Sequence, residues 1–233
     1  TPFRSRWLNV AAAHASGFLI LLPPRWFRYF HFAHHRFTQM PGKDPELAAP
    51  KPETWGQYLL HISGIPVWIS HVSTLVRNAA GRCEDDFVPT GKRDVVRNEA
   101  RIMLAAYLAL LLASLAFRSS ALLFVWLIPM LVGQPFLRLY LLAEHGRCAY
   151  VANMLENSRT TLTNALVRRL AWNMPYHAEH HSYPAVPFHK LPELHRLAAA
   201  HLGVTETGYG RFHARYAPAM EGTGLPNGPR STA

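Results

Sequence analysis

Histidines recur with the same spacing at two places in the chain. Residues 31–35 read His-Phe-Ala-His-His, and residues 177–181 read His-Ala-Glu-His-His. In a helix, positions i, i+3 and i+4 lie on one face, so each group directs three imidazoles to the same side. Neutral imidazole is a common ligand of iron, zinc, copper and nickel. The pattern predicts a shared metal site whose ligands are His31, His34, His35, His177, His180 and His181.

The number of candidate ligands bears on the identity of the metal. Six imidazole nitrogens exceed what one tetrahedral zinc ion uses, and a set of six or more without cysteine favours a pair of iron ions. His145, which directly follows Glu144, is a candidate seventh ligand. The seven other histidines are assigned no role: His14, His61, His71, His189, His195, His201 and His213.

Carboxylates lie near the candidate ligands in the sequence. Metal-bound imidazoles donate their other N–H to a carboxylate, a carbonyl or water. Asp44, Glu144 and Glu179 are therefore candidates to hold and orient the ligand rings. Glu179 points away from the ligand face of its helix, so an exposed surface position is an equal alternative for it. The run from Asn157 to Thr161 is interpreted as a helix-capping turn without a functional role.

Two apolar runs lie between the histidine groups. Residues 102–117 and 119–137 contain no charged side chain, and Arg118 stands alone between them. At ~1.5 Å per residue they give about 24 and 28 Å, close to the ~30 Å hydrocarbon core of a bilayer. They predict a transmembrane hairpin. The alternative is a buried hairpin in a soluble core, which the apolar character on all faces disfavours.

The positive charges flank this hairpin. The net charge is +10, and between the two apolar runs only Arg118 is charged. Lys and Arg are enriched in cytoplasmic loops, so the segments before and after the hairpin are expected on the cytosolic side. Two crossings then place both histidine groups on one membrane face. The predicted fold class is an all-α, multi-pass integral membrane protein, with a helical cap on the cytosolic face that carries the histidines.

The remaining segments are assigned from their prolines, glycines and charges. Residues 8–22 are apolar but too short for a span and are followed by Pro23-Pro24, so an interfacial or re-entrant helix is predicted. A single domain is expected over residues 1–216. Its other parts are a loop at 36–54, an interfacial helix at 55–78, a solvated loop at 81–99, a polar helical stretch after the second span to residue 170 and a helix at 191–202. After this domain, a disordered tail is predicted at 217–233.

Cysteine content and charge exclude several other classes of protein. Cys83 and Cys148 are too few and too far apart for a disulfide framework, a zinc ribbon or an iron–sulfur cluster, and reduced, structural thiols are expected. A basic chain suits nucleic acid, anionic lipid or an acidic protein partner. Nucleic acid is not expected, because no recognition motif is present and the apolar hairpin has no use there.

The histidine groups resemble the second and third histidine boxes of the membrane fatty acid desaturases, with His145 as a further match. Asp44-Pro-Glu-Leu after the first group, Asn173-Met-Pro-Tyr before the second and Pro187-Phe-His-Lys-Leu-Pro-Glu-Leu-His195 after it match the same family. The resemblance covers about residues 1–202. Its motifs are specific to the wider desaturase and hydroxylase superfamily and do not fix the reaction.

The resemblance implies a membrane-bound enzyme with two iron ions held by histidines on the cytosolic side. Such an enzyme uses O2, and electrons from an external donor of the ferredoxin or cytochrome b5 type, to desaturate a long-chain acyl lipid or acyl-CoA. One family feature is missing, a His-x(3–4)-His box before the first group. We therefore expect further ligands upstream of Thr1, and the chain as given to be an incomplete, inactive fragment.

Two alternatives stay open from the sequence. A lipid or carotenoid hydroxylase or ketolase would share the same scaffold, because one oxidant can desaturate or insert oxygen. A non-catalytic metal-binding or transport protein would need ionisable residues inside its spans, along an ion path. Residues 102–117 and 119–137 contain none, which disfavours transport.

Overall fold

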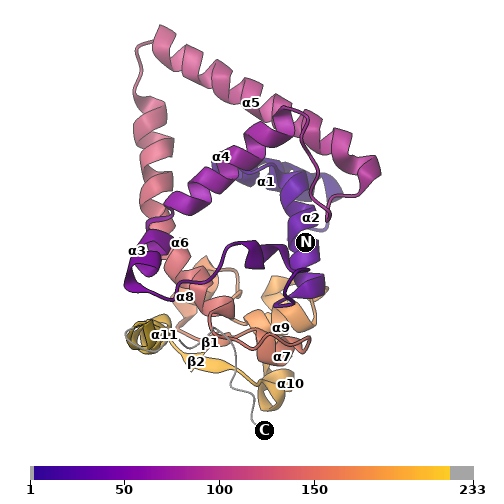
Figure 1. The fold of residues 1–233 in the computed structure, drawn as a ribbon, viewed down its shortest axis with the longest axis vertical. Helices are drawn as coiled ribbons and strands as arrows, with labels where there is room; N and C mark the ends of the chain where they lie inside the picture. Colours follow the sequence, from indigo (N-terminus) through magenta and orange to yellow (C-terminus); the bar gives the residue numbers. More distant parts are fainter. Residues whose placement is uncertain (1–2, 221–233) are drawn as a thin grey trace. The chain divides into compact units, whose positions relative to one another are not determined.

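The computed structural model describes residues 3–220, and its described part is helical apart from two strands of three residues each (Figure 1). This confirms the predicted all-α class. The chain divides into two compact units, which we describe separately. The first comprises residues 3–32 and 63–135, and the second comprises residues 33–62 and the described residues from 136 onward. The single domain over residues 1–216 stays a prediction.

The first unit contains the apolar helices. Its elements are α1 (Arg6–Leu19), the start of α2 (Pro24–Phe37), α4 (Ile65–Ala79), the turn η2 (Thr90–Lys92), α5 (Arg93–Ala116), the π-helical turn η3 (Leu123–Leu127) and the start of α6 (Ile128–His145). Helix α4 packs along α5, where Leu75, Ala100 and Met103 are buried against Phe18 and Tyr107.

Two helical segments are long and apolar enough to cross a membrane. They cover residues 90–116 and 123–145, so both predicted spans are helical but their limits differ from 102–117 and 119–137. Only 17% and 11% of their apolar windows are buried within the structure. A hairpin in a soluble core would be covered on all sides, so this exposure argues against the soluble alternative.

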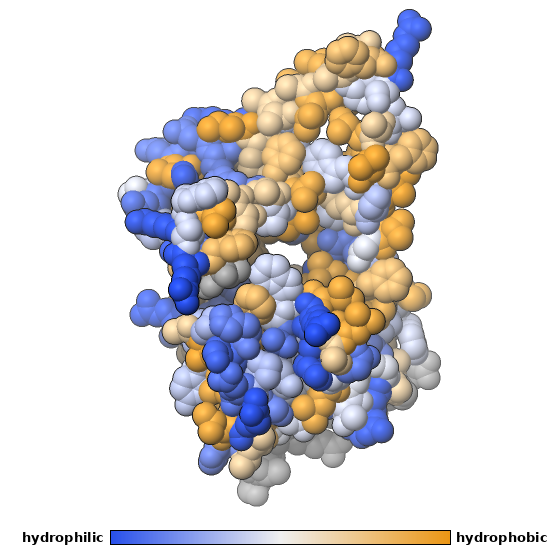
Figure 2. All heavy atoms as spheres, turned by 180° about the vertical axis from the view of Figure 1, so that it is seen from behind, coloured by the Kyte–Doolittle hydropathy of each residue, from blue (hydrophilic) through white to orange (hydrophobic). Residues whose placement is uncertain are grey.

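The exposed surface of these helices is apolar. Figure 2 shows orange side chains gathered over the part of the molecule that α5 occupies at the top of Figure 1. On α5 the exposed large apolar residues include Ile102, Leu108, Leu112 and Leu115. Soluble monomers rarely expose a continuous apolar surface of this kind, whereas lipid tails cover it at no cost.

The predicted solvated loop at 81–99 is wrong from residue 93 onward, where α5 begins. The charged residues of this segment predicted exposure to solvent, but one of them is buried with partners. Glu99 is 6% exposed, and its carboxylate accepts the backbone N–H of Arg25 at 2.9 Å and lies 2.9 Å from Nε2 of His14. Val96, about one helical turn before Glu99 on α5, is fully buried. The polar start of α5 is thus part of the folded unit.

Breaks in the apolar helices fall at proline and glycine. Helix α1 ends before Pro23-Pro24, and α2 leaves it at 99°. Helix α3 (Trp55–Ser63) is separated from α4 by Gly64, whose φ of 72° lies in the left-handed region that glycine adopts readily. If each of these two bent pairs is one span, the structure contains up to four candidate spans.

The second unit assembles short elements around the ends of α2 and α6. They are η1 (Pro45–Ala48), α3, α7 (Met154–Asn157), β1 (Thr160–Leu162), α8 (Ala165–Leu170), α9 (His177–Ser182), η4 (Phe188–Lys190), α10 (Leu191–Ala198), η5 (Ala199–His201), β2 (Thr205–Thr207), α11 (Tyr209–Tyr216) and η6 (Pro218–Met220). Strands β1 and β2 are parallel, with Thr161 paired to Glu206. The apolar core of the unit contains Tyr58, Leu142 and Phe212.

Two predictions about this unit need correction. The polar stretch to residue 170 is not one helix, because Asn153 and Asn164 cap two separate short helices with a strand between them. The predicted disorder of residues 217–233 is wrong for residues 218–220, which form η6, because Met220 is 9% exposed and packs in the core. Residues 221–233 of that tail lie outside the described residues. Cys83 and Cys148 are free and buried, as expected.

Candidate metal centre

Four of the predicted ligands converge in the second unit. His34 comes from α2, His145 is the last residue of α6, and His177 and His181 lie one turn apart on α9. One ring nitrogen of each lies within 4.8 Å of one from every other member. All four side chains are buried, with exposures of 3–7%. Buried imidazoles at this spacing are a donor set for a transition metal.

The outer nitrogen, Nδ1, has a hydrogen-bond partner in two of these rings. Nδ1 of His34 lies 3.0 Å from the carboxylate of Asp44, and Nδ1 of His145 lies 3.1 Å from the carbonyl oxygen of Asn157. Both acceptors require a hydrogen on Nδ1. Nδ1 of His177 lies 3.3 Å from the carboxylate of Glu144 but makes no hydrogen bond among the described residues. Asp44 thus lies where it can orient a predicted ligand ring, and Glu144 lies close to another.

The fourth ring is fixed by a hydroxyl group. Thr38 Oγ1 donates its hydrogen to the carbonyl oxygen of His34 at 2.7 Å and lies 3.0 Å from Nδ1 of His181. A hydroxyl has one hydrogen, so in the second contact the oxygen accepts and Nδ1 of His181 donates. The rings of His34, His145 and His181 therefore carry a hydrogen on Nδ1.

The inner nitrogens, Nε2, of His145 and His181 are then available as ligands. Nε2 of His145 lies 2.9 Å from Nε2 of His177, which donates in this contact because Nδ1 carries the hydrogen of His145. Nε2 of His181 is buried and has no hydrogen-bond partner among the described residues. A cation between the rings would bind such nitrogens. The residues present thus fit a bound metal ion.

The three other predicted ligands form a smaller group. In the second unit the rings of His35 and His180 lie 4.7 Å apart, and the ring of His35 stacks on that of His181 at 4.2 Å. His31 lies one turn before His35 on the continuous helix α2, so both rings share a face. Within the second unit, six of the predicted ligands therefore lie together on α2, α6 and α9.

Burial keeps the imidazoles of α9 neutral. Desolvation lowers the pKa of His177 and His181 well below the usual value near 6.5, and neighbouring histidines lower both further. Burial, followed by His34, lowers the pKa of His180 to about 4. Neutral imidazole is the form that binds metal. At pH 7 these rings are ready to bind without first losing a proton.

Gln39 and Asn157 connect the helices that carry the ligands. Gln39 is not among the residues predicted from the sequence, and Asn157 belongs to the run that was interpreted as a capping turn. Gln39 has a φ of 58°, and its backbone N–H donates to Asp44 Oδ2 at 2.8 Å. Its side-chain amide donates to the carbonyl oxygen of His145 at 2.9 Å. Asn157, fully buried, donates to the carbonyl oxygen of Thr38 at 3.0 Å. The left-handed backbone at Gln39 is strain retained at a site, as is common where geometry must be fixed.

Arg159 holds the end of α6 that carries His145. Its buried guanidinium donates to the carbonyl oxygens of Ala143 at 2.5 Å and Gly146 at 2.8 Å, and lies over the ring of Phe212. Carbonyls of the last helical turn have no partner within the helix, so this cation satisfies them. Within the run 157–161, which the sequence interpreted as a capping turn, Arg159 thus caps the end of α6.

Glu179 occupies neither of its two expected positions. It is fully buried, which excludes the surface position, and its partners are not ligand rings. One oxygen lies 2.5 Å from Nδ1 of His195 and the other accepts from Thr160 Oγ1 at 2.5 Å. It thus ties α9 to α10 and β1. His195, to which the sequence assigned no role, is one of these partners.

The chain enters α9 through two residues with left-handed backbone, Trp172 and Asn173, whose φ values are 53° and 57°. The side chain of Asn173 donates to the carbonyl oxygen of Phe188 at 3.1 Å, which fixes the turn. Pro175 accepts the backbone N–H of Thr161 at 2.8 Å, so β1 holds the segment from the other side. These contacts set where the histidines of α9 begin.

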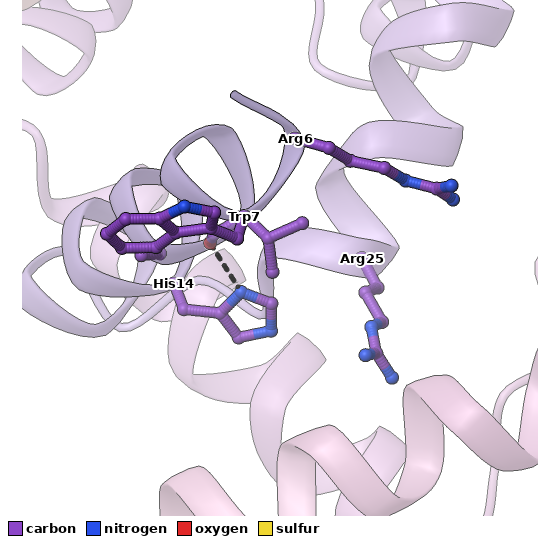
Figure 3. A pocket seen from close by; sticks show the side chains of 6 residues that line it. Arg6, Trp7, His14 and Arg25 are labelled. Carbon is purple, nitrogen blue, oxygen red and sulfur yellow. Dashed lines mark hydrogen bonds between the residues drawn. The ribbon is translucent and has the colours of Figure 1, made fainter. Parts of the chain in front are cut away.

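A pocket in the first unit has a different character (Figure 3). Arg6, Trp7, His14 and Arg25 line it, together with Val10 and Ala11. Nδ1 of His14 donates to the carbonyl oxygen of Val10 at 2.8 Å, and Nε2 of His14 faces Glu99. The pocket holds none of the predicted ligands.

Together, apolar helices of membrane length and a buried cluster of histidines define an all-α protein that fits a membrane and contains a candidate metal site. The sequence profile of the family described as fatty acid desaturase matches residues 1–213, which is most of the chain. The chain belongs to this family, and a desaturase-type function on a lipid follows from that membership. No curated protein and no solved structure matches the chain.

Proposed function

We propose that the protein is a membrane-bound, O2-dependent oxidoreductase with two iron ions that desaturates fatty acyl chains. The observation that carries the proposal is the convergence of four buried imidazoles, those of His34, His145, His177 and His181, with one ring nitrogen of each within 4.8 Å of one from every other. Nδ1 is held by a hydrogen bond in three of them, His34, His145 and His181. An all-nitrogen site without cysteine suits iron better than structural zinc.

The second ion would be held by His35 and His180, together with His31 one turn earlier on α2. Three nitrogens leave this ion with room for further ligands or water. When bound, the two iron ions supply the redox chemistry with O2 that breaks an unactivated C–H bond, which no side chain can perform.

The residues of this chain position and protect the site. Asp44, the carbonyl oxygen of Asn157 and Thr38 hold the rings of three ligands, so a metal ion would need no reorganisation of these rings. Burial of the ligand set excludes bulk water from the site. Exclusion of water protects reactive species from side reactions.

The substrate and the electron donor follow from chemistry and charge. A long acyl chain, on a lipid or on CoA, partitions into the bilayer that α5 and α6 are apolar enough to span. The net charge of +10 suits an acidic redox protein of the ferredoxin or cytochrome b5 type at the cytosolic face. That face is inferred from the basic segments on both sides of the hairpin.

Elemental analysis of the purified full-length protein tests the metal, and mass spectrometry of acyl products tests the reaction. We expect iron, and products that have lost two hydrogens. Zinc at one ion per chain, without iron, would overturn the proposal. Products that gain one oxygen instead would assign the hydroxylase reaction to the same scaffold.

A further inference from the structure

The pocket in the first unit brings two arginines together beside apolar side chains. Its volume is about 690 Å³, within the range of about 300–1,000 Å³ that small ligands fill. In Figure 3 the side chains of Arg6 and Arg25 lie on one side of the view, and Trp7 lies on the other. The lining residues all belong to α1 or to the first turn of α2, and no carboxylate is among them: Arg6, Trp7, Val10, Ala11, His14 and Arg25.

The pocket carries positive charge that its neighbours leave uncompensated. The carboxylate of Glu99, a side chain that is 5% exposed, lies 2.9 Å from Nε2 of His14. Nδ1 of His14 already donates to the carbonyl oxygen of Val10, so the contact with Glu99 needs a second hydrogen. With that hydrogen, the His14 and Glu99 side chains together are neutral, whichever of them holds it. The two guanidinium charges of Arg6 and Arg25 therefore remain.

One of these arginines is fixed in place and the other is unpaired. The backbone N–H of Arg25 donates to Glu99 at 2.9 Å, and its Nε lies 3.6 Å from the same carboxylate. The Arg25 side chain is still 49% exposed, so its guanidinium keeps donors for a ligand. Arg6 is exposed and has no hydrogen-bond or ion-pair partner within residues 3–220. Guanidinium groups bind phosphate through paired N–H donors, so the two arginines favour a phosphate group.

The contacts of α1 place the pocket at a particular level along α5. His14 contacts Glu99, and one turn later the carbonyl oxygen of Phe18 accepts from the hydroxyl of Tyr107 at 2.7 Å. The end of α1 thus lies against the apolar part of α5, whereas His14 lies at its charged start. Arg25 returns the chain to the level of Glu99.

This level corresponds to the head groups of a bilayer. Glu99 lies three residues before Ile102, where the apolar run of α5 begins, which is about 4.5 Å along a helix. The head-group layer on each side of the hydrocarbon core is about 5–7 Å thick. Glu99, and with it His14 and Arg25, therefore lies within this layer when the apolar run fills the core.

The exposed apolar side chains of the pocket agree with this level. Trp7 is 70% exposed and Val10 is 47% exposed. Trp is enriched at membrane–water interfaces, where its ring meets lipid and its N–H meets the head groups. A pocket for a water-soluble anion has no use for an exposed apolar wall. The pocket therefore suits a lipid better than a soluble phosphate compound.

We propose that this pocket binds the phosphate of an anionic lipid head group. Arg6 and Arg25 donate to the phosphate oxygens, and Trp7 and Val10 contact the start of the acyl tails. The bound lipid fastens the 99° bend between α1 and α2 at the membrane surface. None of the lining residues is a predicted metal ligand, so the inference does not rest on the proposed function.

Native mass spectrometry of the full-length protein in detergent tests the site by counting bound lipids. Phosphatidylglycerol is the anionic probe, and phosphatidylcholine is the zwitterionic reference. Arg6→Gln and Arg25→Gln each remove one charge, and Arg25→Lys keeps it. Because Arg6 has no partner within the described residues, Arg6→Gln tests the pocket without disturbing a contact. The matched control is Arg211→Gln, which removes an exposed arginine of α11. Soluble CoA, which carries phosphate without a lipid tail, is added as a competitor.

We expect the wild-type protein to bind phosphatidylglycerol in preference to phosphatidylcholine. Arg6→Gln and Arg25→Gln should each bind phosphatidylglycerol about fivefold more weakly. Arg25→Lys should fall between Arg25→Gln and wild type, because an ammonium keeps the charge but not the paired donors. Arg211→Gln should bind as wild type does, and CoA should displace no lipid.

Three outcomes overturn the inference. Wild-type binding of phosphatidylglycerol in both Arg6→Gln and Arg25→Gln would show that the pocket holds no lipid phosphate. A loss in Arg211→Gln as large as in Arg6→Gln would show that binding follows net charge and not the pocket. Displacement of lipid by CoA that depends on Arg6 and Arg25 would assign the pocket to a soluble phosphate compound.

Discussion

Thr38 Oγ1 lies 3.0 Å from Nδ1 of His181, although 143 positions separate the two residues in the chain. Thr38 follows the first histidine group and His181 ends the second, so a residue of one group orients a ligand of the other. The hydroxyl accepts because its only hydrogen is donated to the carbonyl oxygen of His34. This contact links the two groups before any metal binds.

Thr38→Val is expected to weaken metal binding about 10- to 100-fold, because His181 loses the acceptor that keeps its hydrogen on Nδ1. Thr38→Ser preserves the hydroxyl and is expected to bind within a fewfold of wild type. Metal titrations of both variants measure the effect. Equal affinities for Val and Ser would show that the hydroxyl does not control the tautomer of His181.

Removal of a ligand has a larger expected effect. His34→Ala or His181→Ala leaves an incomplete ligand shell, so metal content and turnover should both be lost in the full-length protein. The exposed His201 serves as the control, and His201→Ala should retain both. Elemental analysis and product formation are the measurements. Normal iron content in both ligand variants would disprove the shared site.

His213 would not be a neutral control, although it was assigned no role from the sequence. Its Nδ1 accepts from the hydroxyl of Tyr58 at 2.9 Å, and its Nε2 donates to the carbonyl oxygen of Leu139 at 3.0 Å. His213→Ala leaves the half-buried hydroxyl of Tyr58 without this partner. We expect a stability loss of about 1–3 kcal/mol, measured as a lower melting temperature with the metal content per folded protein unchanged.

The metal-free protein should lose stability as the pH falls. The pKa of His177 and His181 lies well below 6.5, and that of His180 is about 4, so the unfolded chain takes up protons before the folded one does. The contribution of these rings is fully present above about pH 6.5 and declines as the pH falls toward 4. Melting temperatures of the metal-free protein across this range test it, and a flat profile would contradict it.

Arg159→Met should destabilise the second unit, because two buried carbonyls at the end of α6 lose a charged donor. About 1–3 kcal/mol is expected for each unsatisfied group. Arg159→Lys keeps the charge but cannot reach both carbonyls at once, so an intermediate loss is expected. Denaturant titration in detergent measures the difference. Equal stability of the Met variant and wild type would exclude the capping role.

The sequence by itself determined the class of the fold and the members of the candidate ligand set. Periodic spacing identifies His31, His34 and His35 as one helical face, and runs of apolar residues identify the span-length helices, because both signals are local. The start of α5 is not a local signal, because Glu99 is charged yet buried through its contacts with Arg25 and His14. A buried charge is recognisable only once its partners are in place.

Tertiary structure alone decided how the ligand set divides and what supports it. His34 and His35 are neighbours in the chain, yet His34 joins His145, His177 and His181 while His35 stacks on His181 and faces His180. No spacing encodes this, because it depends on how α2, α6 and α9 meet. The same reason hid Thr38 and Gln39, whose partners lie on other elements. Their chemistry is ordinary, and only packing brings it to the metal centre.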